Sequence, residues 1–170
     1  ARNEEKLLPR CINSIIDARK NLANDITVDI ILSVDASTDE TYAIGQELLK
    51  NHGSVISLNE GNVGHARKLA AEHAFSRFKA PDHQCWLANT DADCKVPSNW
   101  LTYQLQKAAT GINVIAGIIK VDSYEEHHNE VANIFLKEYT LNSDGTHPHV
   151  HGANFGIRGD IYKKFGGWGQ

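Results

Sequence analysis

Residues 85–100 read CWLANTDADCKVPSNW, and we expect the rest of the chain to be organised around this stretch. The run Cys85–Asn89 is typical of a short buried strand. Asp91 and Asp93 follow where that strand ends, and Ser98 stands where it can cap a following helix. A strand, an acidic loop and a capped helix, in this order, indicate polar side chains presented at the carboxyl end of a strand.

Asp91 and Asp93 are separated by one residue, so their carboxylates repel each other and are costly to remove from water together. A divalent cation offsets both effects, because Mg²⁺ and Mn²⁺ take carboxylate oxygens and keep coordination positions open for phosphate. The alternative is a solvated acidic turn, since a D-x-D triplet often occurs by chance. The polar loops elsewhere in the chain favour the metal site.

The composition is that of one soluble globular domain. The chain has 170 residues, of which 41% are hydrophobic and 22% charged. Its net charge of -4 gives no electrostatic reason to expect a nucleic acid partner, and no apolar run reaches the length of a membrane span. Cys11, Cys85 and Cys94 are odd in number and scattered, which indicates no disulfide framework and a reducing compartment.

Helical and strand patterns alternate along the chain. Helices are predicted at about 3–16, 40–51, 65–78, 98–105, 125–141 and 161–165, and strands at 28–34, 55–58, 85–89, 114–121 and 152–158. This alternation predicts an α/β fold with a mostly parallel sheet flanked by helices. Because the chain opens on a helix start, we expect the first strand of the sheet to be missing from it, and we also expect a C-terminal part to be missing.

Ligands bind such sheets beyond the carboxyl ends of the strands. The polar residues Asp35, Asn62, Asp91 and Asp93 and the histidines of 147–151 all fall in loops after or between predicted strands. We therefore expect them on one rim. No G-x-G-x-x-G follows the first strand and no G-K-[ST] is present, which argues against a dinucleotide fold and a P-loop enzyme.

Five motifs in this order resemble those of family 2 glycosyltransferases, and the resemblance covers nearly the whole chain. They are ARNEE (1–5), VDASTD (34–39), NVGHAR (62–67), DAD (91–93), and GANFGIR (152–158) followed by Gly166-Gly167. The resemblance implies a GT-A fold and a hexosyltransferase class of activity, in which a sugar moves from a UDP- or GDP-sugar to an acceptor. It also suits a cytoplasmic or membrane-peripheral enzyme of bacterial origin.

The resemblance also implies which residues bind the nucleotide sugar. Ala1 and Glu4 lie in the first motif, where Glu4 matches the position that reaches the ribose or base. Asp35 matches the second of the family's paired aspartates, which hydrogen-bonds the base, whereas the first of that pair is Val34 here. Arg67 matches a basic residue near the base or diphosphate.

In the family's D-x-D motif the first aspartate addresses the ribose or a metal-bound water, and the second ligates the metal. Asp91 and Asp93 match these two positions. A bound Mn²⁺ or Mg²⁺ neutralises the charge left on the nucleoside diphosphate. Inversion also needs a carboxylate base for the acceptor hydroxyl, which in this family follows the Gly-Gly turn. We expect that base beyond Gln170, so that residues 1–170 form a single but incomplete catalytic domain.

His147, His149 and His151 alternate, so on an extended segment their side chains would point to one side. His151, next to the last strand, is the candidate third metal ligand; the alternative is a set of solvated histidines in a loop. Trp168 is a candidate acceptor-side aromatic residue. Arg158 is expected either at the diphosphate or at the adjacent helix.

Two other functions compete with glycosyl transfer. One is a non-catalytic module that binds nucleotide sugars without turning them over. The other is a metal-dependent phosphotransferase or phosphohydrolase with Asp91 as nucleophile. The second is disfavoured because such enzymes carry the D-x-D pair after their first strand, whereas here it follows a late strand.

Overall fold

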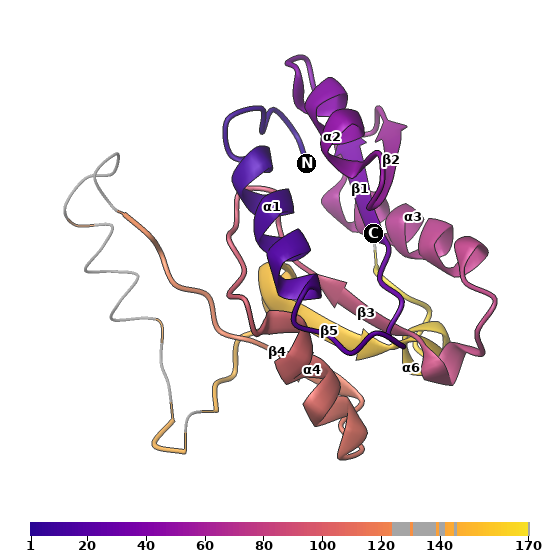
Figure 1. Cartoon of the computed structure of the whole chain (residues 1–170). Coiled ribbons are helices and arrows are strands. Elements are labelled where there is room, and N and C mark those ends of the chain that lie inside the picture. The colour runs from indigo at the N-terminus through magenta and orange to yellow at the C-terminus, as the bar shows by residue number, and fades with distance from the viewer. Residues whose placement is uncertain (124–129, 131–138, 140–141, 145, 170) are drawn as a thin grey trace.

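Figure 1 shows the computed structural model of the chain, which describes residues 1–123, 130, 139, 142–144 and 146–169. Its helices are α1 (Leu8–Arg19), α2 (Thr41–Leu49), α3 (Val63–Arg77), α4 (Trp100–Ala109) and α6 (Gly159–Lys164). Its strands are β1 (Ile30–Asp35), β2 (Gly53–Leu58), β3 (Trp86–Asn89), β4 (Val114–Ala116) and β5 (Phe155–Arg158). Short 3₁₀ turns occupy Asp82–Gln84 and Gly152–Asn154. The predicted alternation and the α/β class are confirmed.

The N-terminal half is built on β1 and β2, which pair in parallel from Ile30 opposite Gly53 to Asp35 opposite Leu58. A β-strand sends alternate side chains to opposite faces. The residues on one face of β1 form a buried core with α1 and α2, made of Leu8, Ile12, Ile30, Leu32, Val34 and Leu49. On the other face, Ser33 Oγ donates to Ala66 O of α3 at 2.7 Å. Helix α3 therefore covers the face opposite α1 and α2.

The C-terminal half is a separate sheet in the order β3-β5-β4, and β5 runs antiparallel to both neighbours. Among the described strands, parallel pairing is thus confined to β1 and β2. The reason is the connection: β3 and β4 are joined through α4 and run in the same direction, whereas β5 enters between them after a long excursion of the chain. The core of the C-terminal half includes Val96, Trp100 and Leu101.

The direction of β5 decides which of its ends meets the acidic loop. Phe155, at the start of β5, lies opposite Asn89 at the end of β3, and Arg158 lies opposite Trp86 at the other end. The turn Gly152–Asn154, which precedes β5, is therefore on the same rim as the loop that follows β3.

Several boundaries differ from the predicted ones. Helix α1 begins at Leu8 rather than near Asn3, because the Asn3 side chain accepts a hydrogen bond from Thr38 N at 2.8 Å instead of capping a helix. Strand β4 covers only Val114–Ala116 of the predicted strand. The predicted helix at 125–141 lies almost entirely outside the described residues.

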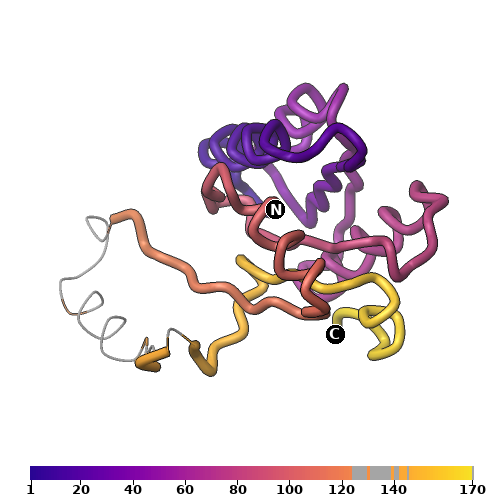
Figure 2. Tube along the Cα trace, turned by 60° about the horizontal axis from the view of Figure 1, so that its bottom comes forward, coloured from indigo at the N-terminus to yellow at the C-terminus, as the bar shows by residue number. Residues whose placement is uncertain are grey.

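Residues 117–123 leave the body of the molecule and residues 146–151 return to it (Figure 2). Asn154 ties their base together: its amide donates to Ile118 O at 2.8 Å, its backbone oxygen accepts from Gly117 N at 2.8 Å, and its Oδ1 accepts from Trp100 Nε1 at 2.9 Å. Within the described part of the chain, no helix is long and apolar enough to cross a membrane.

Candidate functional site

The acidic loop after β3 is fixed by α1. Cys11 Sγ donates to Asp91 O at 3.3 Å, and Arg10 Nη2 donates to Asp93 O at 2.9 Å. Farther along the loop, Val96 N donates to the buried Ser14 Oγ at 3.1 Å. Because helix side chains satisfy the backbone of the loop, the two aspartate carboxylates are left to face the rim. Sequence patterns show α1 only as an amphipathic helix, so this supporting role could not be predicted from them.

Arg67, on the first turns of α3, is a basic side chain on this rim. Its Nη2 donates to Asp91 Oδ1 at 2.5 Å, and its guanidinium carbon lies 5.4 Å from the centroid of the Trp168 ring. A Cβ added to Gly152 would come within 2.4 Å of the same guanidinium carbon. The ion pair is partly covered, since the side chains are 23% and 42% exposed for Arg67 and Asp91. Arg67, Asp91 and the predicted aromatic Trp168 thus meet at one place.

Trp168 lies against Phe155 as well, with ring centroids 5.3 Å apart, and its backbone N donates to Tyr162 Oη at 3.2 Å. Its indole Nε1 is buried and has no hydrogen-bond partner among the described residues. The glycine-rich segment around Trp168 passes over the start of α3, where a Cβ on Gly64 would lie 2.3 Å from Gly169 O. Gly64 therefore lets the Gly169 backbone approach the start of α3, and Gly152 lets the Arg67 guanidinium lie against the backbone.

Asp93 is exposed, and its Oδ1 accepts a hydrogen bond from Cys94 Sγ at 3.4 Å. Burial, and then the neighbouring Asp93 carboxylate, raise the pKa of the Cys94 thiol to about 11. Cys94 is therefore a neutral thiol at pH 7, as expected of a cysteine with a structural role.

Glu4 belongs to the same acidic region. Its burial raises the pKa of its carboxyl, and the negative charge of Asp93 adds to this, with smaller contributions from Asp39 and Asp91. Its backbone N donates to Thr41 Oγ1 at 2.7 Å, which holds the segment before α1 against the start of α2. Asp93 of the fourth motif is thus near enough to Glu4 of the first motif to affect the ionisation of Glu4.

Ala1 acts through its backbone. Its amino group donates to Ser33 O at 2.6 Å, and its carbonyl oxygen accepts from Asp35 N at 2.9 Å. This is the bonding of a parallel strand pair, on the edge of β1 that faces away from β2. Ala1 therefore positions the start of the chain, including Glu4, beside the carboxyl end of β1.

Asp35 is almost fully buried, with 6% of its surface exposed. Its carboxylate accepts hydrogen bonds from three consecutive backbone N–H groups, those of Glu60, Gly61 and Asn62, at 2.8, 3.0 and 2.8 Å. Burial opposes ionisation, but these donors outweigh it and hold the pKa of Asp35 below its ordinary value. Asp35 thus shapes the loop that leads into α3, where Asn62 Oδ1 caps the helix by accepting from His65 N.

The three alternating histidines point to one side, as predicted. Their rings stack, with the ring centroid of His149 5.9 Å from that of His147 and 5.6 Å from that of His151. The Tyr139 ring stacks on His149 and His151, with centroid distances of 4.9 and 5.5 Å. In the described ranges no three His, Cys, Asp or Glu side chains are grouped closely enough to hold a metal. His151 as a third ligand beside Asp91 and Asp93 stays a prediction.

Arg158 lies at the opposite end of the sheet. It pairs with Asp160 through two hydrogen bonds of 2.6 and 2.9 Å and stands at the start of α6. Arg158 therefore lies at the adjacent helix, where its side chain pairs with Asp160 and makes no cap hydrogen bond.

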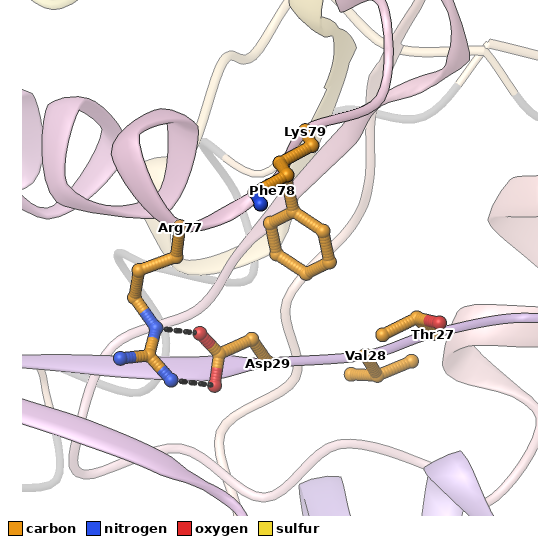
Figure 3. Close-up of a pocket in the computed structure, with 6 residues that line it drawn as sticks. All are labelled: Thr27, Val28, Asp29, Arg77, Phe78 and Lys79. Atoms are coloured by element: carbon orange, nitrogen blue, oxygen red, sulfur yellow. Dashed lines mark hydrogen bonds and ion pairs between the residues drawn. The ribbon is translucent and has the colours of Figure 1, made fainter.

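A surface pocket of about 520 Å³ also lies away from this rim (Figure 3). It lies before the start of β1 and at the C-terminal end of α3, and its lining residues are Thr27, Val28, Asp29, Arg77, Phe78 and Lys79. Arg77 and Asp29 form an ion pair there.

The α/β fold brings a D-x-D loop, a basic side chain and a glycine-rich segment together on one rim beyond the strands, which is where such folds bind their ligands. The sequence model of glycosyl transferase family 2 matches residues 1–166, and the chain belongs to that family. No curated protein sequence matches the chain.

Two solved structures share the fold. One is the mannosyltransferase PcManGT from Pyrobaculum calidifontis in complex with GDP-Man and Mn²⁺, with a TM-score of 0.65 and 16% identity over 98% of this chain. The other is S. aureus TarS 1-349, with a TM-score of 0.63 and 16% identity over 98% of this chain. The chain spans 45% and 47% of these two structures. The predicted GT-A fold is confirmed.

Proposed function

We propose that the chain binds a nucleoside-diphosphate sugar at the rim of Arg67, Asp91 and Asp93, as the donor site of a glycosyltransferase. The observation that carries the proposal is the meeting of Arg67 and Asp91 next to the exposed Asp93. An arginine matches a diphosphate in charge and geometry, and a pair of carboxylates suits the cation that accompanies it. Family membership supports the same activity.

The residues present suit a divalent cation. Asp93 is exposed, and among the described residues its carboxylate accepts a hydrogen bond only from the Cys94 thiol, at 3.4 Å, so the carboxylate is accessible to a ligand from solvent. Asp93 would ligate the cation, and Asp91 would hold it through a water or contact the ribose. When bound, the cation supplies Lewis-acid neutralisation of the charge on the departing diphosphate. The Mn²⁺ and GDP-Man in the PcManGT structure support this assignment.

Two further predicted residues, Glu4 and Asp35, contribute to binding of the nucleotide sugar. Glu4 and Asp35 lie on the nucleoside side, where Asp35 also fixes the loop before α3. Transfer with inversion breaks the bond between the anomeric carbon and the diphosphate oxygen while the acceptor hydroxyl attacks from the opposite face and loses its proton to a base. We assign that base to no residue of this chain, and we propose residues 1–170 as the donor-binding part of a single catalytic domain. A donor-binding module without turnover has the same site and differs only in the transfer assay.

Calorimetric titration of UDP and GDP into the chain, with Mn²⁺ and then with EDTA, tests this proposal. We expect one nucleotide to bind in the presence of Mn²⁺, and Asp93→Ala to weaken that binding at least about tenfold. Asp17→Ala is the matched control, because it removes an exposed carboxylate on α1 that pairs with Lys20. Absence of binding by a folded wild-type chain, or equal weakening by both variants, would reject the donor site.

A further inference from the structure

The Arg67–Asp91 pair occupies groups that both expected ligands need. In the structure the guanidinium of Arg67 donates to Asp91 Oδ1 at 2.5 Å. A cation that approaches the two aspartates meets an arginine already bound to one of them. A diphosphate that approaches Arg67 likewise meets a guanidinium already bound to a carboxylate. Each ligand therefore has a protein group as its competitor.

When both ligands bind, neither has to compete for its protein group, because the exchange frees Asp91 for the cation and Arg67 for the diphosphate. If the diphosphate takes the guanidinium, the negative charge of Asp91 is left uncompensated, and that charge favours a cation beside it. If the cation takes Asp91, the guanidinium is released for the diphosphate. Coulomb attraction between the cation and the diphosphate adds to this exchange. Positive coupling follows, and it acts equally in both directions because binding free energies are linked.

The surroundings of Arg67 suit a side chain that changes partner while staying in place. Trp168 lies 5.4 Å from its guanidinium carbon and offers a ring face on which a guanidinium stays stabilised as it turns. Gly152 leaves room on the backbone side, since any Cβ there would fall 2.4 Å from the guanidinium carbon. Neither contact requires that Asp91 be the acceptor.

We propose that Arg67 couples the binding of the nucleoside diphosphate to that of the divalent cation. In the empty site it holds Asp91 and weakens cation binding, and it transfers to the diphosphate when the nucleotide binds. This inference rests on the proposed donor site. It goes further in assigning to Arg67 the coupling between the two ligands, because its guanidinium exchanges Asp91 for the diphosphate.

The test measures Mn²⁺ affinity by electron paramagnetic resonance of free Mn²⁺, with and without saturating GDP or UDP. For the wild-type chain we expect the nucleotide to tighten Mn²⁺ binding at least about fivefold. For Arg67→Met we expect Mn²⁺ alone to bind about fivefold more tightly than to the wild type, with the coupling reduced toward one. Arg67→Lys, which keeps the charge but loses the two-pronged donor, is expected to lie between them.

Arg77→Met is the matched control. Arg77 is on the same helix and pairs with Asp29 in the pocket before β1, away from the carboxylate rim (Figure 3). We expect it to leave both Mn²⁺ affinity and coupling unchanged, and circular dichroism checks the fold of every variant. If Arg67→Met unfolds, Arg67→Lys decides, and coupling equal to that of the wild type overturns the inference.

Two failures are distinguishable. A wild-type chain that binds Mn²⁺ and nucleotide independently keeps the proposed donor site but overturns the role of Arg67. A folded wild-type chain that binds neither overturns both. Unchanged or weaker binding of Mn²⁺ alone to Arg67→Met also overturns the inference, because the guanidinium would then not compete for Asp91.

Discussion

At the scale of single residues, Asp35 shows how a motif residue can have a second task. Asp35 resembles an aspartate that binds the base of the nucleotide. In the structure its carboxylate accepts hydrogen bonds from three backbone N–H groups of the loop 60–62. These donors belong to the backbone, so no side-chain pattern in the sequence reveals them. The loop they fix leads into the helix that carries Arg67.

The contacts of Asp35 predict a dependence of stability on pH. Its pKa is lowered in the folded chain, so its ionised form contributes stability above the ordinary carboxyl pKa, and this contribution is lost as the pH falls through the lowered value. We expect Asp35→Asn to lower the free energy of unfolding by about 1–3 kcal/mol at pH 7. Below about pH 4 its stability should fall less steeply than that of the wild type. Urea unfolding at several pH values measures both.

Asp17→Asn, which removes an exposed carboxylate on α1, is the control variant. The assignment is wrong if Asp35→Asn and the wild type lose stability in parallel as the solution is acidified.

At the scale of elements, the sequence predicts where strands and helices lie better than it predicts how strands pair. The D-x-D loop and a following helix come after β3, as the pattern predicts, but α4 begins at Trp100 with Asn99 at its N-cap position, so the predicted cap at Ser98 is wrong. The antiparallel position of β5 depends on a pairing across 66 residues, between Asn89 and Phe155, which local periodicity cannot register. The role of Gly152 has the same origin, because it becomes a neighbour of Arg67 only through this pairing.

The central place of β5 makes Gly156 sensitive to substitution. A Cβ there would lie 2.3 Å from Gln104 Oε1 and 2.7 Å from Trp86, whose indole N–H donates to the same Gln104 oxygen at 2.7 Å. We expect Gly156→Ala to lower the free energy of unfolding by about 1–3 kcal/mol through overpacking. Gly169→Ala, where no heavy atom lies within 4 Å of the added Cβ, is the matched control. Equal stability of the two variants in urea would contradict the packing argument.

At the scale of the whole molecule, α1 joins the two sheets. Ile15 packs against both the core of the parallel pair and the core around Val96, Trp100 and Leu101. Ser14 and Cys11 add hydrogen bonds to the loop after β3. The two halves therefore share one helix, and we expect them to unfold together.

Ile15→Ala tests this sharing. The three tryptophans, Trp86, Trp100 and Trp168, all lie in the C-terminal half, so their fluorescence reports that half, whereas far-ultraviolet circular dichroism reports both. We expect Ile15→Ala to shift both urea transitions together, by about 1–3 kcal/mol. A shift in one signal alone would mean that the halves are independent.

The position of β5 also bears on the order in which the molecule folds. Strands β1 and β2 are joined by a short helix, and their contacts can form as soon as residue 58 is available. Among the described pairings, by contrast, β3 and β4 meet only β5, so the second sheet needs the chain as far as residue 158 before it can close. Closing so distant a contact is slow compared with local pairing. We therefore expect the β1–β2 pair to form before the second sheet closes. The rim on which Arg67 meets Asp91 and Trp168 is then among the last features to assemble.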